Sequence, residues 1–333
     1  MTSSSITRSE NALAILHGLD SLYLASLEDA PKPMKQIKSF PFTPILGWSM
    51  SRYSMFSICK RKYFYHYYNK YDPEIPVRLI QELKNLSSLP LVAGIAAHEV
   101  IEALLNRLRK TSQDVDRAKF MDYALRTSEH LTRSSQFHEV YYQEIKEVFI
   151  EDIYPKVELS LENLLDSDRY RWLVEEAIQT SDNWMIEPPG YGETRMDGLK
   201  VYFKVDFLFP VGDLLYILDW KTGKQDPERH RKQLVGYAAW ASYHFEVEAD
   251  KVVPTIAYLR PQYEEVEEVF NEFDLEHFAI QVRAETEEMY EYCRDLEQNI
   301  PIGKSEFTRI DDPRICSICE FRGLCFPDEY PIT

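Results

Sequence analysis

The chain has 333 residues, of which 44% are hydrophobic, and this is enough to bury a sizeable core in one large domain or two. Its formal net charge of -17 excludes binding to nucleic acid through overall attraction, so any such contact must be local. No stretch approaches the ~18 uninterrupted apolar residues of a membrane span, and the polar start lacks the regions of a signal peptide. We therefore expect a cytoplasmic protein that makes no membrane contact.

The first residues, 1–45, are predicted to form an extension before one domain that covers residues 46–333. The extension contains one plausible amphipathic helix, about Glu10 to Leu27, and then a linker with Pro31, Pro33, Pro41 and Pro44. Beyond it, the stretch from Ser49 to Tyr71 is dense in aromatic side chains. It predicts one helix whose rings mostly pack in the core.

Residues 94–165 are predicted to form a mainly helical layer, because they carry long charged stretches and few glycines or prolines. Its first helix is expected to start at Gly94, where small side chains allow a close approach to other backbone. His98 and Glu102 lie four residues apart and share one face of this helix. A single helical histidine is more often a structural residue than a ligand, so His98 is a candidate metal ligand only because of the other motifs in the chain.

The periodicity changes to that of strands between residues 184 and 260, where turns are expected at Pro188-Pro189-Gly190, Asp197-Gly198 and Gly212-Asp213. The run from Leu214 to Lys221 is apolar on both faces, which is typical of an interior strand. Asp226 can cap a helix that runs to about Phe245, with Pro227 at its start, and Val252 to Leu259 makes another buried strand. These elements predict a mixed sheet with helices on both faces.

Two aspartates, Asp206 and Asp219, end neighbouring apolar runs joined by a hairpin at Gly212-Asp213, with the glycine supplying a positive φ. In that register Asp206 faces Asp219 at a Cβ separation of roughly 5 Å, where like charges are destabilising unless a cation compensates. Lys221 shares the face of Asp219 because side chains alternate along a strand. Two carboxylates and an ammonium at one point suggest phosphodiester hydrolysis on a hard metal ion, with the lysine orienting or helping to deprotonate water.

The helix that follows carries further polar side chains next to this pair. It opens with a basic run that includes Arg229, Arg231 and Lys232. Gln233 and Tyr237 follow four residues apart, on one face. A basic cluster is more often a solvated surface, and Gln233 and Tyr237 also fit an ordinary amphipathic helix. Beside a metal, however, an amide and a phenol could hold a phosphate or a base of a nucleic-acid strand.

The C-terminal part combines an acidic helix, predicted from Phe270 to Asn299, with a cysteine-rich segment over residues 300–333. Five cysteines without a secretion signal fit metal ligation better than disulfides. Three soft ligands stand in one C-x2-C-x5-C motif, formed by Cys316, Cys319 and Cys325. Cys59 is the best candidate for a fourth ligand, because Cys293 is expected in mid-helix, where a small buried thiol is common. Spacing alone leaves zinc and iron–sulfur open.

Taken in chain order, these motifs resemble the RecB-like nucleases of the PD-(D/E)xK superfamily, in particular the subgroup with an iron–sulfur cluster found in CRISPR adaptation nucleases and AddB-type repair subunits. The resemblance spans about Trp48 to Cys325. The sequence departs from the family at two places: it has Lys60 where a proline is frequent, and the run Phe203-Lys204-Val205-Asp206 starts with phenylalanine where the family often has glycine. Neither departure removes a reacting group. The matching motifs are Ser49 through Cys59, Gly94 to His98, Asp206, Asp219-Trp220-Lys221-Thr222-Gly223-Lys224, Gln233 to Tyr237 and the closing cysteines.

The resemblance implies an α/β fold: a restriction-endonuclease-like core with a central mixed sheet flanked by helices, a helical insert and a cysteine-rich iron–sulfur clasp. It implies Mg²⁺ or Mn²⁺ held by His98, Asp206, Asp219 and the backbone carbonyl of Trp220. It makes Lys221 the catalytic lysine, and Gln233 and Tyr237 the contacts to DNA beside Arg229, Arg231 and Lys232. It also implies a [4Fe-4S] cluster on Cys59, Cys316, Cys319 and Cys325, and an extra acid at Glu193, with Glu187 as the other choice.

We therefore expect a metal-dependent DNA nuclease, with exonuclease action favoured, that acts on single strands or ends in DNA repair, CRISPR adaptation or phage and defence DNA processing. The chain has no G-x-x-x-x-G-K-S/T loop, so unwinding would need a helicase partner, and a CRISPR integrase is another expected partner. Two alternatives belong to other classes. One is a non-catalytic DNA-end-binding or scaffold subunit with the same fold, and the other is a colourless zinc-ribbon adaptor.

Overall fold

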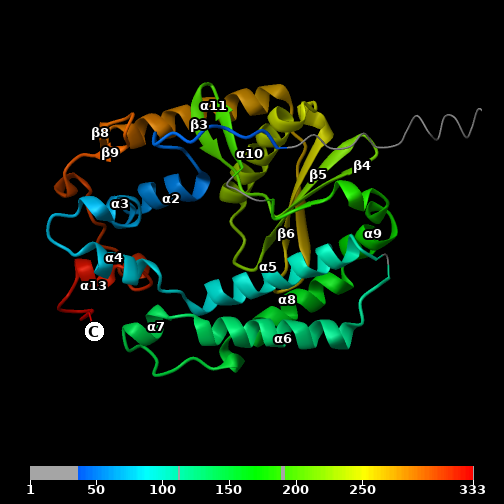
Figure 1. Ribbon diagram of the computed structural model, residues 1–333, viewed down its shortest axis with the longest axis horizontal. Helices are drawn as coiled ribbons and strands as arrows, with labels where there is room; N and C mark the ends of the chain where they lie inside the picture. The colour runs from blue at the N-terminus through cyan, green and yellow to red at the C-terminus, as the bar shows by residue number, and fades with distance from the viewer. Residues whose placement is uncertain (1–36, 112, 189–191, 333) are drawn as a thin grey trace, which may run out of the picture.

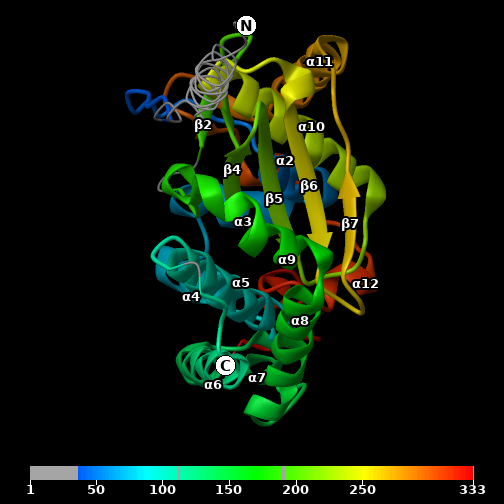
Figure 2. The ribbon, with the colours of Figure 1, turned by 90° about the vertical axis from the view of Figure 1, so that its right-hand side faces the viewer.

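A five-stranded mixed sheet forms the centre of the computed structural model, which describes residues 37–111, 113–188 and 192–332 (Figures 1 and 2). The helix expected at Glu10 to Leu27 lies outside the described residues. The β5 and β6 strands are parallel and the other neighbours are antiparallel, so the predicted mixed sheet is confirmed. The strand order is β1 (Met185–Ile186), β4 (Phe207–Val211), β5 (Leu214–Lys221), β6 (Val252–Tyr258) and β7 (Glu264–Glu267).

The β4–β5 hairpin has the turn and the register that its sequence predicts. Gly212 has a φ of 60°, a conformation that glycine adopts at no steric cost. Phe207 pairs with Leu218, so the next position outward sets Asp206 against Asp219. A smaller hairpin, formed by β2 (Glu193–Met196) and β3 (Leu199–Tyr202), turns at Asp197-Gly198 as expected.

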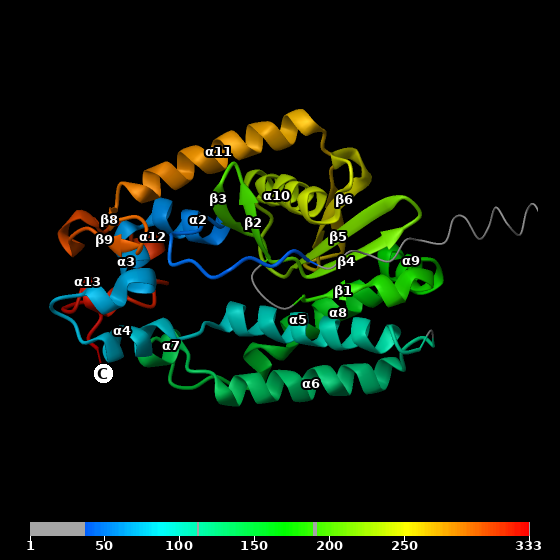
Figure 3. The ribbon, with the colours of Figure 1, turned by 45° about the horizontal axis from the view of Figure 1, so that its top comes forward.

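Helices cover both faces of the sheet (Figure 3). On one face lies a layer of α2 (Met50–Ile58), α10 (Pro227–Phe245) and α11 (Glu272–Tyr290). On the other face lie α5 (Leu89–Leu108), α8 (Tyr154–Asp166) and α9 (Asp168–Glu175), with α6 (Arg117–Ser134) packed outside α5. The alternation of β4 explains both layers, because Phe207 and Phe209 enter the α5 core while Leu208 enters the α10 core.

Shorter elements gather at the end of the molecule away from β4 and α9, near the C-terminus (Figures 1 and 3). They are α3 (Lys60–Tyr68), α4 (Val77–Lys84), α7 (His138–Tyr141), α12 (Pro313–Cys316), α13 (Arg322–Cys325), β8 (Cys293–Asp295) and β9 (Ile300–Pro301). Short 3₁₀ segments link the elements at Asn69–Tyr71, Ile150–Asp152, Ala177–Asn183, Ala249–Lys251 and Lys304–Glu306, and the longest of them, Ala177–Asn183, is kinked at Thr180.

The α5 helix has the length and composition of a membrane-crossing helix, the one such helix among the described residues. Its apolar residues, among them Val92, Val100 and Leu104, are buried against α6 and α8, which is the behaviour of a core helix. It starts at Leu89 after the Ser88 cap, so the expected start at Gly94 is wrong. Gly94 instead lies where α5 approaches the end of β5, since a Cβ there would be 3.1 Å from Thr222 Oγ1.

Two further helix predictions are wrong in their extent. The helix expected from Ser49 to Tyr71 is broken at Cys59, whose extended backbone (φ -152°) ends α2 and whose sulfur caps α3 by accepting from Lys62 N–H. The acidic helix expected up to Asn299 ends at Tyr290, because the chain then turns into the β8–β9 hairpin. Both breaks put cysteines at element ends rather than inside helices.

Replacing Gly236 by alanine tests the packing between α10 and its neighbours. A Cβ at this position would overlap the Phe203 ring and lie 3.2 Å from Phe278 Cζ. We expect Gly236→Ala to lower the free energy of unfolding by ~1–3 kcal/mol, because overpacking outweighs the better helix propensity of alanine. Urea unfolding measures the change.

Gly303→Ala is the matched control, since Gly303 has a φ of -60° and a Cβ there would lie 3.5 Å from Ser305 Oγ. It should leave the midpoint unchanged or raise stability by ~0.4–1 kcal/mol through the unfolded state. A Gly236→Ala protein that resists urea as well as wild type contradicts the packing described here.

Candidate active site

Asp206 and Asp219 meet at the ends of β4 and β5, in a position shielded from solvent. Asp219 is 3% exposed. Asp206 Oδ2 accepts a hydrogen bond from the Trp220 backbone N–H at 3.0 Å. Asp219 is equally constrained, because its Oδ1 accepts from Gln233 Nε2 at 2.9 Å and from the Tyr237 hydroxyl at 2.5 Å. The hairpin and α10 together fix both carboxylates.

A histidine and a third acid complete the cluster from other elements. His98 reaches in from α5, where its Nε2 lies 3.1 Å from the Trp220 carbonyl oxygen and its Nδ1 lies 3.5 Å from Asp206 Oδ2. Glu187, which follows β1, has its Oε1 3.8 Å from the same Nδ1. One ligand atom from each of His98, Glu187 and Asp206 lies within 4.8 Å of the others. This is a donor set that fits a divalent cation.

Of the two acids that the resemblance offers, Glu187 lies beside His98 and Asp206 and Glu193 does not. Glu193 lies in β2 and forms ion pairs with Arg195 at 2.5 Å and Lys200 at 3.9 Å. Glu187 is held toward the cluster by a backbone hydrogen bond to the Asp206 carbonyl (2.8 Å) and an ion pair with Lys204 (2.9 Å). Its φ of 39° is a left-handed conformation that a non-glycine residue rarely adopts, and such backbone strain is common at functional sites.

The electrostatics of the cluster favour a cation. Burial raises the pKa of Asp206 to about 7, and the charge of Asp219 adds to the effect. Burial lowers the pKa of His98, but the hydrogen bond with Glu187 and the charge of Asp206 outweigh it, so the net direction is upward. The hydrogen bond from His98 in turn lowers the pKa of Glu187. Without a cation the cluster keeps protons, which a bound metal would displace.

Lys221 and Asp219 form the second half of the site. The Lys221 ammonium contacts Asp219 Oδ2, while the other carboxylate oxygen, Oδ1, accepts from Gln233 and Tyr237. Asp219 thus lines the same hollow as His98 but is turned toward Lys221. The alternation along β5 puts Lys221 on the face of Asp219, as the sequence predicts.

Gln233 and Tyr237, which the resemblance makes contacts to DNA, both hold Asp219 in this structure. Gln233 also donates to the Tyr237 oxygen at 2.5 Å. Tyr237 is 1% exposed, and burial together with the charge of Asp219 raises the pKa of its hydroxyl, which stays a hydrogen-bond donor. Both residues therefore position the Asp219 carboxylate, and both also line an open groove.

Two hollows meet at the site and share Lys204 and Lys221. One, of about 580 Å³, is lined by the histidine and the acids of the cluster. The other, of about 610 Å³, we call the basic groove, because Arg52, Lys204, Lys221 and Arg229 line it. Its lining residues in the described chain include no aspartate or glutamate. In a chain with 55 acidic and 38 basic residues, this is a marked local excess of positive charge.

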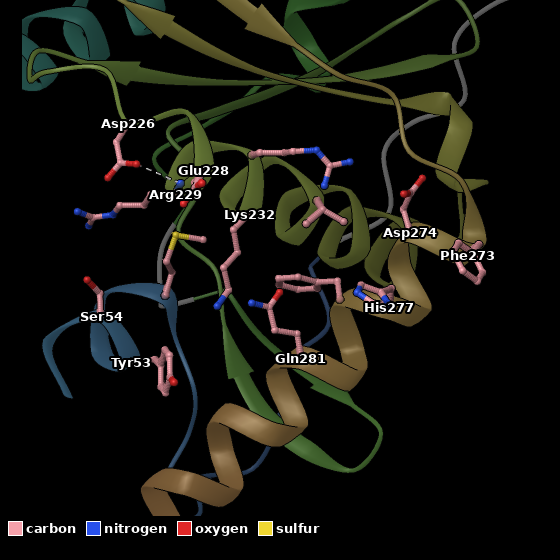
Figure 4. A pocket seen from close by; sticks show the side chains of 14 residues that line it. Tyr53, Ser54, Asp226, Glu228, Arg229, Lys232, Phe273, Asp274, His277 and Gln281 are labelled. Atoms are coloured by element: carbon pink, nitrogen blue, oxygen red, sulfur yellow. Dashed lines mark hydrogen bonds between the residues drawn. The ribbon is translucent and has the colours of Figure 1, made fainter. Parts of the chain in front are cut away.

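Arg231 and Lys232 do not share the basic groove with Arg229. They line a separate hollow of about 760 Å³ between α2, α10 and α11 (Figure 4). Arg231 forms an ion pair with Glu268 at 2.7 Å, and Lys232, whose side chain is 19% exposed, forms one with Glu285. Arg229 lines both this hollow, where Figure 4 shows it, and the basic groove. The structure thus brings one residue of the predicted basic run to the site and engages the other two elsewhere.

Four of the five cysteines surround one small hollow at the far end of the molecule. Cys59 at the α2–α3 break faces Cys316, Cys319 and Cys325. Burial raises the pKa of Cys319 to about 12 and of Cys325 to about 11, so a metal would have to displace protons there. Cys293 lies outside this set and contacts the Tyr68 hydroxyl at 3.6 Å.

Sequence reasoning did not single out Arg52 and Lys204, and it named Glu187 only as the second choice for the extra acid. Lys204 stands two residues before Asp206, and a period of two could have placed it beside the site. Arg52 and Glu187 carry no such signal, because α2 and the segment after β1 reach the site only through the fold.

Comparisons with known proteins place the chain in a family. Residues 47–326 match the family described as the PD-(D/E)XK nuclease superfamily. A search of curated proteins found no match. A provisionally assigned exonuclease from Eubacterium rectale is similar in structure, with a TM-score of 0.42, 11% identity and coverage of 82% of this chain and 86% of its own. SSO0001 has a TM-score of 0.29 and 16% identity, and the match covers 64% of this chain and 97% of that one. Because the family match includes every residue of the site, the chain belongs to the PD-(D/E)XK nuclease superfamily.

Proposed function

We propose that this nuclease is a DNA exonuclease that uses Mg²⁺ or Mn²⁺ and acts on single strands or DNA ends. One observation carries the proposal: His98, Glu187 and Asp206 converge within 4.8 Å, and Asp219 and Lys221 flank them. Nitrogen and carboxylate ligands of this kind suit a divalent cation, and the adjoining ammonium suits an attack by water on a phosphodiester. The basic groove beside the cluster supports a polyanionic substrate.

Each residue of the site has a different role in the proposed hydrolysis. A bound Mg²⁺ or Mn²⁺ would polarise the scissile phosphate and lower the pKa of a water molecule. His98, Glu187, Asp206 and Asp219 would hold the ion. Lys221, in contact with Asp219, is placed to orient the attacking water or to take its proton. Gln233 and Tyr237 keep Asp219 in place through their hydrogen bonds, so their contribution is to the geometry of the carboxylate.

Repair, CRISPR adaptation and phage or defence DNA processing all fit such an activity. A helicase or a CRISPR integrase would then be a separate partner chain. The non-catalytic end-binding subunit is the competing proposal, and it predicts DNA binding without metal-dependent cleavage.

Two substitutions separate a metal-dependent nuclease from a non-catalytic end-binding subunit. Lys221→Ala should lower cleavage of end-labelled DNA by at least ~100-fold, because it removes the group that assists the nucleophile. Glu187→Gln should raise the Mg²⁺ concentration needed for half-maximal cleavage by ~10–100-fold, because it weakens the ligand set. Titrations with Mg²⁺, Mn²⁺ and chelator, at single-nucleotide resolution of the products, measure both.

Glu193→Gln is the matched control, since it makes the same change in the acid that pairs with Arg195 and Lys200. It should cleave like wild type. If Glu193→Gln loses activity and Glu187→Gln keeps it, the ligand set is wrong. If wild-type protein binds DNA but no metal supports cleavage, the end-binding subunit is the better description.

We also propose that Cys59, Cys316, Cys319 and Cys325 hold a [4Fe-4S] cluster. The four thiols share one hollow, although Cys59 is far from the others in sequence. Four thiolates satisfy zinc or an iron–sulfur cluster, and the resemblance to nucleases with an iron–sulfur cluster is what favours the latter. Such a cluster would cross-link the α2–α3 junction to the C-terminal segment.

Metal analysis of anaerobically purified protein tests this second proposal. We expect ~4 iron and ~4 sulfide per chain and a brown absorbance. Cys59→Ser should lose both, because it removes a ligand, and Cys293→Ser should keep both, because its sulfur lies outside the hollow. Colourless wild-type protein with stoichiometric zinc would instead support the zinc-ribbon alternative.

A further inference from the structure

Arg52 in α2 is a cation of the basic groove that no carboxylate neutralises. Lys204 and Lys221 in the same groove contact Glu187 and Asp219 respectively. Arg52 forms no ion pair within the described residues, in a protein whose net charge is -17. A guanidinium left unpaired in so acidic a chain is available for an anion from outside.

The position of Arg52 is fixed although its charge is free. Its guanidinium lies 4.1 Å from the centre of the Tyr67 ring, and one of its terminal nitrogens donates to the Gly47 carbonyl at 2.8 Å. Its Nε is buried and has no hydrogen-bond partner in the described part of the chain. The stacked ring and the backbone carbonyl therefore hold the planar fork in one orientation at the wall of the groove, with N–H donors to spare.

The groove has the chemistry of a path for a single strand. Tyr67 and Tyr202 line it together with the cations, and aromatic rings beside basic side chains are what single-stranded nucleic acid requires. A volume of about 610 Å³ falls in the range of small-ligand pockets, about 300–1,000 Å³, which gives room for a few unstacked nucleotides. Lys221 lies in its wall, which joins the groove to the catalytic cluster.

We propose that Arg52, braced on Tyr67, binds a backbone phosphate of a single DNA strand in the basic groove and guides that strand to the catalytic cluster. This inference rests on the proposed nuclease function for the identity of the ligand. It adds the residue that selects single strands, and the groove along which an end reaches Lys221.

Binding measured without cleavage tests the proposal. The probe is a fluorescently labelled oligothymidylate, with a blunt duplex of equal length for comparison, in chelator and over a series of salt concentrations. Arg52→Gln should weaken single-strand binding by ~10-fold. It should also make the slope of log K against log salt shallower by ~0.7, because the protein then neutralises one phosphate fewer on the single strand. Arg52→Lys keeps the charge without the fork, so it should keep the slope and lose part of the affinity.

Arg231→Gln is the matched control, because it removes the same charge from an arginine that is paired with Glu268 outside the groove. It should bind both probes like wild type. Thermal unfolding of each variant reports whether it folds. If Arg52→Gln does not fold, the affinity and salt slope of Arg52→Lys test the proposal instead. Unchanged affinity and slope in folded Arg52→Gln overturns the proposal, as does an equal loss on duplex.

The two proposals fail in different ways. If oligothymidylate binding depends on Arg52 but no metal supports cleavage, the strand path survives and the nuclease activity fails. If the wild-type protein cleaves DNA and Arg52→Gln binds and cleaves equally well, the activity survives and the strand path fails.

Discussion

The repulsion between two carboxylates dominates the organisation of this protein. Asp206 and Asp219 face each other across the β4–β5 hairpin, and burial prevents water from screening them. Burial raises the pKa of Asp206 to about 7, and the charge of Asp219 adds to the effect. The fold offsets the repulsion with the Trp220 N–H, the side chains of α10 and the Lys221 ammonium. The histidine of α5 and the acid after β1 join Asp206 in a donor set that fits a divalent cation.

Acidic and basic side chains are also separated on the surface around the site. The acids of the cluster gather in one hollow and the basic side chains in the other, with Lys204 and Lys221 between them. A polyanion can therefore approach an acidic protein along one local path, as the net charge requires. The arrangement also explains why Lys204 pairs with Glu187, because this contact lies where the two hollows meet.

The predictable parts of the site are those encoded by neighbouring residues. The turn at Gly212, the register that opposes Asp206 to Asp219, and the helix that starts at Pro227 all follow from short patterns. Arg52 was not singled out and Glu187 was only the second choice for an extra acid, since α2 and the end of β1 are brought to the site by packing between distant segments. The break at Cys59 was missed for a similar reason, because its sulfur meets the C-terminal segment only in the folded chain.

Gln233 and Tyr237 show a different limit of sequence reasoning. Their helix was predicted correctly, but the same pattern suits a contact to substrate or a support for Asp219. Only the fold shows that Tyr237 is buried.

The most direct test of the site as a whole is anomalous X-ray scattering from crystals soaked in Mn²⁺. We expect a manganese peak within bonding distance of Glu187, Asp206 and His98, with the Asp219 carboxylate turned toward it. A manganese peak elsewhere, or none at this cluster, would contradict the assignment.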